Sequence, residues 1–380
     1  MNIKSLLIGS AAALVAFTGA QAADAIVAAE PEPMEYVRVC DAFGTGFFYI
    51  PGTETCLKIG GFVRFQTSFG RSEFDFQGVD GDHSDWDTHT RVDINFDART
   101  DTELGTLRSY INIEADSGSK NFAVVDAAGD DIGFGRAGNS FFIDEAFIEL
   151  GGFKVGRFYS WWDSGINGEN DSLGNVTNFD SIAYTYDGGT WRAGISLDEL
   201  SGLVDADEFA AGILGTHHDL GVAATVGFSL GGVNLDVLGG YDNWAEEGAV
   251  RAILSADLGP GTFQLAGIWA SDPNTYWAAS EWTLAASYAF KATDKLTITP
   301  AVQYFGKLAS SDPAATDAFA SGTHQWRVGA TVGYEIVSGL NLLATVDYNK
   351  VDNDHNFGGA GDSADNPSFT RGFLRLQRNF

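Results

Sequence analysis

The segment that follows Ser160 carries residues suited to shaping an electric field. It contains four carboxylates: Asp163, Glu169, Asp171 and Asp180. Tight turns between them are possible at Gly165, Gly168 and Gly174. Cations lie elsewhere, towards the two ends of the chain: Arg64, Arg91, Arg108, Arg371 and Arg375. Carboxylates that face guanidinium groups across a narrow aqueous passage would orient polar molecules without making or breaking bonds.

The residues alone leave two arrangements open for both sets of charges. If the segment at about 161–180 folds inward, its acids face a lumen. If it folds outward, they are simply solvated. The arginines likewise could act on passing solutes or could pair with neighbouring carboxylates, for example Arg91 or Arg108 with Asp93 or Glu114.

Motifs for other chemistry are missing from the sequence. It has no nucleophile elbow, phosphate loop, H-E-x-x-H or C-x-x-C motif, so we expect no catalytic residue, no cofactor and no metal site. The chain has 51 acidic and 22 basic residues, which disfavours nucleic acid as a partner because phosphates need a basic surface. The acids could hold divalent cations at a lipopolysaccharide surface or could only keep loops solvated.

The elements that must position these charges are predicted by strict alternation. In 91–99, Val92, Ile94, Phe96 and Ala98 alternate with charged and polar residues, and 107–116 repeats the pattern. In a β-strand the two sets lie on opposite faces. Arg64, Arg91, Arg108, Arg371 and Arg375 all belong to the polar set of their strands.

We expect about sixteen strands, near 57–69, 88–99, 105–116, 140–150, 153–160, 181–187, 191–198, 219–230, 233–241, 248–258, 262–270, 280–291, 295–305, 323–335, 340–350 and 368–380. Short glycine turns alternate with long acidic loops between them. This is typical of an all-β, antiparallel, up-and-down transmembrane β-barrel with short periplasmic turns and long extracellular loops. Closure would place the first and last strands side by side, so their arginines would gather on one wall.

The beginning of the chain reads as an export signal. Lys4 precedes an apolar run and Ala20-Gln21-Ala22, which predicts a cleaved signal peptide over 1–22. Residues 23–56 then read as a periplasmic lead-in, and 57–380 as the barrel. The cysteines number two, Cys40 and Cys56, and an even pair in an exported protein predicts a disulfide.

Three stretches resemble the alphaproteobacterial general porin family: the Cys-containing opening from Tyr36 to Gly61, the segment from Gly156 to Asp163, and the end from Phe373 to Phe380. The final Phe380 is similar to the assembly signal of outer-membrane barrels. The resemblance implies a sixteen-stranded barrel, a homotrimer, diffusion of small solutes and an inward-folded constriction loop. The sequence departs from the family at Trp161-Trp162, where Phe-Phe is frequent, which leaves the pore width open.

The leading hypothesis is therefore a passive, water-filled outer-membrane channel for small hydrophilic solutes, weakly cation-selective because of its acidic loops. Its partners would be outer-membrane lipid and lipopolysaccharide, its solutes, and two further copies of the chain. A sugar-specific channel is the alternative, indicated by the aromatics Tyr159, Trp161 and Trp162. A barrel enzyme using His324 and a surface adhesin with a closed lumen are the remaining hypotheses.

Overall fold

The computed structural model describes residues 38–70, 86–118, 121–125, 131–136, 140–201, 218–309, 318–353 and 368–380. Val39–Phe380 form one compact unit, and the description below concerns that unit. The predicted signal peptide at 1–22 and residues 23–37 of the lead-in lie outside the described residues.

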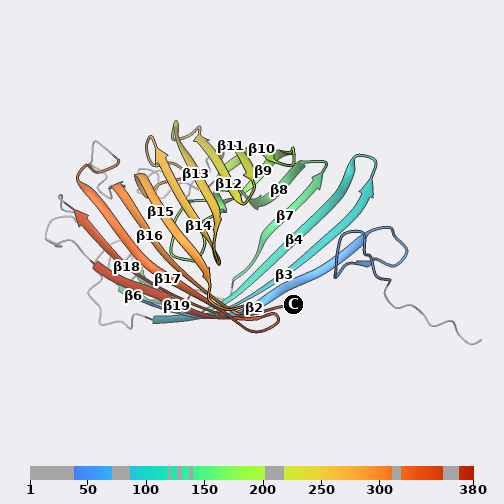
Figure 1. Ribbon diagram of the computed structural model, residues 1–380, viewed down its shortest axis with the longest axis horizontal. Coiled ribbons are helices and arrows are strands. Elements are labelled where there is room, and N and C mark those ends of the chain that lie inside the picture. The colour runs from blue at the N-terminus through green and yellow to red at the C-terminus, as the bar shows by residue number, and fades with distance from the viewer. Residues whose placement is uncertain are drawn as a thin grey trace, which may run out of the picture. The chain divides into compact units, whose positions relative to one another are not determined.

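Within the described residues, sixteen antiparallel strands form a closed barrel (Figure 1). In chain order they are β2 (Cys56–Gly70), β3 (Trp86–Thr102), β4 (Gly105–Gly118), β7 (Ser140–Leu150), β8 (Phe153–Tyr159), β9 (Asn178–Asp187), β10 (Trp191–Ser201), β11 (His218–Leu230), β12 (Val233–Asp242), β13 (Glu247–Leu258), β14 (Gly261–Ala270), β15 (Ser280–Lys291), β16 (Leu296–Leu308), β17 (Thr323–Val337), β18 (Leu340–Asn353) and β19 (Ser368–Asn379). Each of these strands pairs with the next, and β19 returns to pair with β2. The predicted fold class and strand order are confirmed.

Alternation sets which face of each strand points outward. On β2 and β3, register pairs such as Val63 with Val92 place apolar side chains on the outer face, whereas Arg64 pairs with Arg91 on the inner face. At the short turn between β7 and β8, Gly151 and Gly152 have φ of 56° and 94°. Such left-handed conformations strain residues with a Cβ, so this turn requires glycine.

Three short strands were not predicted. β1 (Phe48–Tyr49) adds to β2, and β5 (Asn121–Val125) pairs with β6 (Asp131–Arg136) in a separate two-stranded sheet. These runs are too short to show alternation above background. No helix in the described part of the chain is long and apolar enough to cross a membrane.

The barrel closes at the pairing of β19 with β2. Their register runs from Arg371 opposite Gly70 to Asn379 opposite Phe62. One residue further, the amide of Phe380 donates to the carbonyl of Gly61 at 3.0 Å, and the amide of Gly61 donates back at 3.2 Å. The chain terminus is therefore hydrogen-bonded into the first strand.

The predicted disulfide joins Cys40 to Cys56, with 6.0 Å between their Cα atoms. Both cysteines are buried, together with Phe47, and the rings of Phe43 and Tyr49 pack against them. The bridge therefore ties a small apolar cluster to the first residue of β2.

Replacing both Cys40 and Cys56 by Ser should loosen this cluster but leave the barrel folded, because the bridge closes only a local loop. Loop entropy of this size contributes about 3 kcal/mol. Limited proteolysis followed by mass spectrometry should detect new cleavage within 41–55 and none within the strands. Cleavage in the strands, or none in either variant or parent, would contradict this expectation.

Candidate functional site

The segment Ser160–Thr177, which joins β8 to β9, lies against the inner faces of distant strands. It starts with a single helical turn, Trp161–Asp163, capped by the Ser160 hydroxyl, which accepts from the Trp162 amide at 3.2 Å. Its next contacts are with strands on the other side of the barrel. The backbone amide of Asn167 donates to the side-chain oxygen of Gln264 on β14 at 2.5 Å. The backbone amide of Glu169 donates to the Thr331 hydroxyl on β17 at 2.9 Å.

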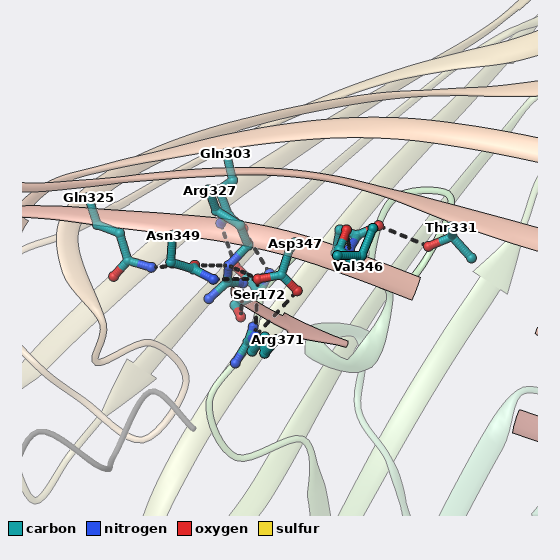
Figure 2. Close-up of polar contacts among 10 residues, drawn as sticks. Ser172, Gln303, Gln325, Arg327, Thr331, Val346, Asp347, Asn349 and Arg371 are labelled. Carbon is teal, nitrogen blue, oxygen red and sulfur yellow. Dashed lines mark hydrogen bonds and ion pairs between the residues drawn. The ribbon is translucent and has the colours of Figure 1, made fainter. Parts of the chain in front are cut away.

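Ser172 forms a further anchor of this segment (Figure 2). Its amide donates to the Gln303 side-chain oxygen at 2.9 Å, and the Gln303 amide nitrogen donates back to its carbonyl at 2.7 Å. Nη1 of Arg327 donates to the Ser172 hydroxyl at 2.9 Å, and its Nε donates to Asn349 at 2.9 Å. Arg327 is buried, so it supports the segment rather than facing solvent.

The predicted acidic residues occupy different environments. Glu169 is exposed and forms an ion pair with Arg375 on β19 at 3.1 Å. Asp163 is exposed and accepts a hydrogen bond from the Thr177 hydroxyl at 2.9 Å. Asp171 is partly buried and accepts from the Ile166 amide at 3.3 Å. Glu169 is thus the carboxylate that reaches a basic residue of the opposite wall.

Asp180 does not lie in the segment, because β9 begins at Asn178, three residues before the predicted start. It shares a face with Ile182 and Tyr184, whose side chains are exposed on the outside of the barrel. There it pairs with Arg157 of β8 at 3.3 Å. Asp180 is therefore separate from the three other predicted carboxylates.

The five predicted cations fall into two groups. Arg91 pairs with Glu114 at 2.7 Å and Asp116 at 2.8 Å. Arg108 likewise contacts Asp97 and Glu149, so the charges of these two arginines are balanced on the wall.

The second group lies at the seam between β2 and β19. Arg64 donates to the Gln377 side-chain oxygen at 2.8 Å, and Arg375 donates to that of Gln66 at 2.7 Å. Arg371 pairs with Asp347 at 3.1 Å. Among described residues, no carboxylate forms an ion pair with Arg64.

An apolar cluster fills the interior next to β9–β16. It combines residues of the segment, Trp162, Ile166 and Leu173, with inner-face residues of these strands. Trp162 is 1% exposed and its ring lies 5.8 Å from that of Tyr276. The aqueous part of the interior therefore lies towards the seam, where the arginines and Glu169 are.

The aromatic residues that suggested a sugar-specific channel do not gather in one track. Trp162 is buried in the apolar cluster, and Trp161 packs against it. The hydroxyl of Tyr159, at the end of β8, donates to Asp144 of β7 at 2.9 Å, and Asp144 also accepts from the inner-face Asn112 of β4 at 3.4 Å, so Tyr159 is held against the wall at β4 and β7.

Sequence reasoning missed the residues that hold the segment. Gln303 and Arg327 were not predicted, because only the cations of the first strands and the last strand were expected to face the passage. A signal was present: the polar face of several strands carries apolar residues, such as Leu238, Ile253 and Ile268. Loss of alternation indicates a strand covered on both faces.

A closed barrel with an apolar outer face and a charged interior crossed by a chain segment defines a channel of the outer membrane. The family model described as the porin subfamily matches residues 24–373. The chain belongs to this porin family and is an outer-membrane porin.

Two known proteins are similar in sequence to this chain over its full length. Outer membrane protein y4fJ of Sinorhizobium fredii is 51% identical over 383 residues, covering 100% of this chain and 99% of that protein. Porin Omp2a of Brucella suis is 36% identical over 403 residues, covering 100% of both.

Solved structures share the fold. The outer membrane channel DcaP of Acinetobacter baumannii gives a TM-score of 0.59 at 14% identity, covering 87% of this chain and 99% of that one. OmpT of Vibrio cholerae, in a trimer form, gives 0.54 at 10% identity, covering 86% and 100%. At such identities the likeness concerns the fold alone.

Asp171 should make ion selectivity depend on pH. Burial raises the pKa of its carboxyl from 3.8 to about 6, against the opposing effect of the Ile166 amide. Because this pKa is raised in the folded protein, the stability that the neutral carboxyl contributes is lost as pH rises through about 6. Ionisation then adds a negative charge to the segment.

Cation preference, measured as reversal potential in a salt gradient, should therefore rise between pH 5 and 7 with a midpoint near 6. The Asp171→Asn variant should lack this step. An identical step in both proteins would assign the titration to another group.

Proposed function

We propose that residues 160–177 form the constriction of a general diffusion channel for small hydrophilic solutes. The ion pair between Glu169 and Arg375 carries this proposal, because it joins the segment to the wall next to the barrel seam. In a sixteen-stranded barrel the lumen is wide enough for water, so selection among solutes requires such a narrowing.

The charges at this narrowing support a transverse field. Arg64, Arg371 and Arg375 lie on β2 and β19, and Glu169 faces them from the segment. Such a field favours small polar molecules, whose dipoles align with it, over apolar ones.

Weak cation preference follows from the balance of exposed charge. Arg91, Arg108 and Arg375 are paired with carboxylates, whereas Asp163 is exposed on the segment and accepts a hydrogen bond from the neutral Thr177 hydroxyl. The formal net charge of −29 adds cation enrichment at the channel mouths.

The other candidate functions have less support. Trp162 is buried and the Tyr159 hydroxyl is bound to Asp144 of β7, so these rings do not form the aromatic track that a sugar-specific channel would need. His324 contacts Asp352 at 3.1 Å and the ring of Tyr304, and no described serine hydroxyl is hydrogen-bonded to it. His324 therefore gives no support to the hypothesis of a barrel enzyme.

Three further features belong to this proposal: cleavage of 1–22, recognition of Phe380 during barrel assembly, and contact of the outer surface with lipid and lipopolysaccharide. The support for the role of Phe380 is its reciprocal hydrogen bonding with Gly61 at the seam, which places it where the barrel closes.

The variant Glu169→Gln should lower the cation-to-anion permeability ratio about twofold, because it removes a carboxylate and leaves Arg375 unbalanced. Reversal potentials in planar bilayers measure this ratio. Glu335→Gln is the matched control, since it removes the same charge from the inner face of β17 near a short turn. Equal shifts in both variants would refute the constriction.

We also propose that three copies assemble, through the outer face of β8 and β9. The outward pair of Arg157 with Asp180 supports this surface. Arg157 is four residues from Phe153, which places it roughly 10 Å into a membrane band about 25 Å tall. Charges facing lipid at that depth cost ~2–4 kcal/mol, whereas a protein partner can solvate them.

Replacing both Arg157 and Asp180 by Leu distinguishes contact with another copy from contact with lipid, because the two arrangements predict opposite changes in stability. If the pair faces another copy, the double variant should dissociate at lower temperature than the parent in unheated gel electrophoresis. If the pair faces lipid, the double variant should be at least as stable as the parent. Val250→Leu, on the outer face of β13, serves as the control.

A further inference from the structure

Arg251, on the inner face of β13, is a buried cation whose partners are backbone carbonyls. It is 4% exposed. Its Nη1 donates to the carbonyl oxygens of Trp162 at 2.9 Å and Leu173 at 2.5 Å, and its Nη2 donates to that of Trp161 at 2.6 Å. The guanidinium also lies 5.1 Å from the Trp162 ring. Among the described residues no carboxylate forms an ion pair with it.

These carbonyls belong to both limbs of the constriction segment. Trp161 and Trp162 open it, and Leu173 lies on the part that returns to β9. A guanidinium is a planar fork with several donors, so one side chain can hold both limbs at once. Burying this charge is tolerated only because these donors are satisfied. Removing the guanidinium group would leave these buried carbonyls without hydrogen-bond donors.

A second loop holds the returning limb from the other side. Residues 271–279, between β14 and β15, place Thr275 and Tyr276 next to Asn175 and Val176. The Asn175 amide donates to the Tyr276 carbonyl and the Val176 amide to that of Thr275, both at 3.0 Å. Tyr276 is fully buried, and its hydroxyl donates to Asp198 on β10 at 2.8 Å. The returning limb is thus held by both this loop and Arg251.

Apart from the ion pair of Glu169 with Arg375, which joins the segment to β19, the segment's other contacts with the wall are individually weaker. Gln264, Gln303 and Thr331 make neutral hydrogen bonds to it, and Arg327 reaches it through the Ser172 hydroxyl. Hydrogen bonds from an ionised donor are stronger than neutral ones. Arg251 alone among these residues combines a charge, burial and contact with both limbs.

We propose that Arg251 is a positioning residue that fixes the width of the channel. By holding both limbs of residues 160–177 to β13, it keeps Glu169 opposite Arg375. This inference rests on the proposed function, since it assumes that the segment forms the constriction.

The test compares Arg251→Met with Arg251→Lys in planar bilayers and in liposome swelling with neutral sugars of graded size. Arg251→Met keeps an apolar stem but removes every donor, so we expect closures about tenfold more frequent and a larger size cut-off. Arg251→Lys keeps the charge but cannot span both limbs, so it should fall between Arg251→Met and the parent.

The matched control is Arg192→Met. Arg192 lies on the inner face of β10 and pairs with Asp236, and within the described part of the chain it makes no hydrogen bond or ion pair to the segment, so this variant loses the same charge without losing such a contact. Arg192→Met should show the same low frequency of closures and the same size cut-off as the parent. Folding of each variant is checked by heat-modifiable gel mobility, a readout that a role in segment position should not change. If Arg251→Met fails to fold, Arg251→Lys against Arg192→Met decides the matter.

Quiet openings and the parental size cut-off in folded Arg251 variants would overturn the inference. Glu169→Gln, measured in the same bilayers, then distinguishes the two proposals. If it still shifts selectivity beyond its control, the segment forms the constriction without needing Arg251. If it does not, the proposed constriction itself fails.

Discussion

The hydrocarbon interior of a membrane offers no water to backbone N–H and C=O groups, so a sheet can span it only without free edges. The pairing of β19 with β2 satisfies that constraint, and the exchange of hydrogen bonds between Phe380 and Gly61 completes it. Closure also fixes the positions of the charges. Arg64 and Arg375 are more than three hundred residues apart in sequence, yet they lie on adjacent strands because the barrel is closed.

The interior of this barrel is divided rather than uniform. Beside β9–β16 it is packed with apolar side chains around Trp162 and Tyr276. Beside the seam it is lined with guanidinium groups, amides and carboxylates. A wall that is apolar on both faces can hold a chain segment firmly, whereas a charged wall can hold water. The apolar packing and the charged lining of the lumen therefore belong to different strands.

Alternation in the sequence was sufficient to predict sixteen strands, their order and their faces, because a period of two leaves little freedom of register. Strand ends were harder, and the early start of β9 moved Asp180 from the segment to the outer surface. The anchors of the segment could not be predicted, since contacts such as Glu169 with Thr331 join residues far apart in sequence. Leu238 and Ile253, however, occupy inner-face positions where alternation predicts polar residues. This departure from the pattern indicates that another part of the chain covers that wall.

The ion pair between Glu169 and Arg375 has a consequence for biogenesis. Arg375 lies on β19, the last strand to be synthesised, whereas Glu169 follows β8 in the first half of the chain. An unfinished barrel has no β19 beside β2, and therefore offers Glu169 no ionic partner there. The contact of this segment with β19 and the sealing of the wall are thus completed together, so an assembly intermediate that has not sealed also lacks this ion pair.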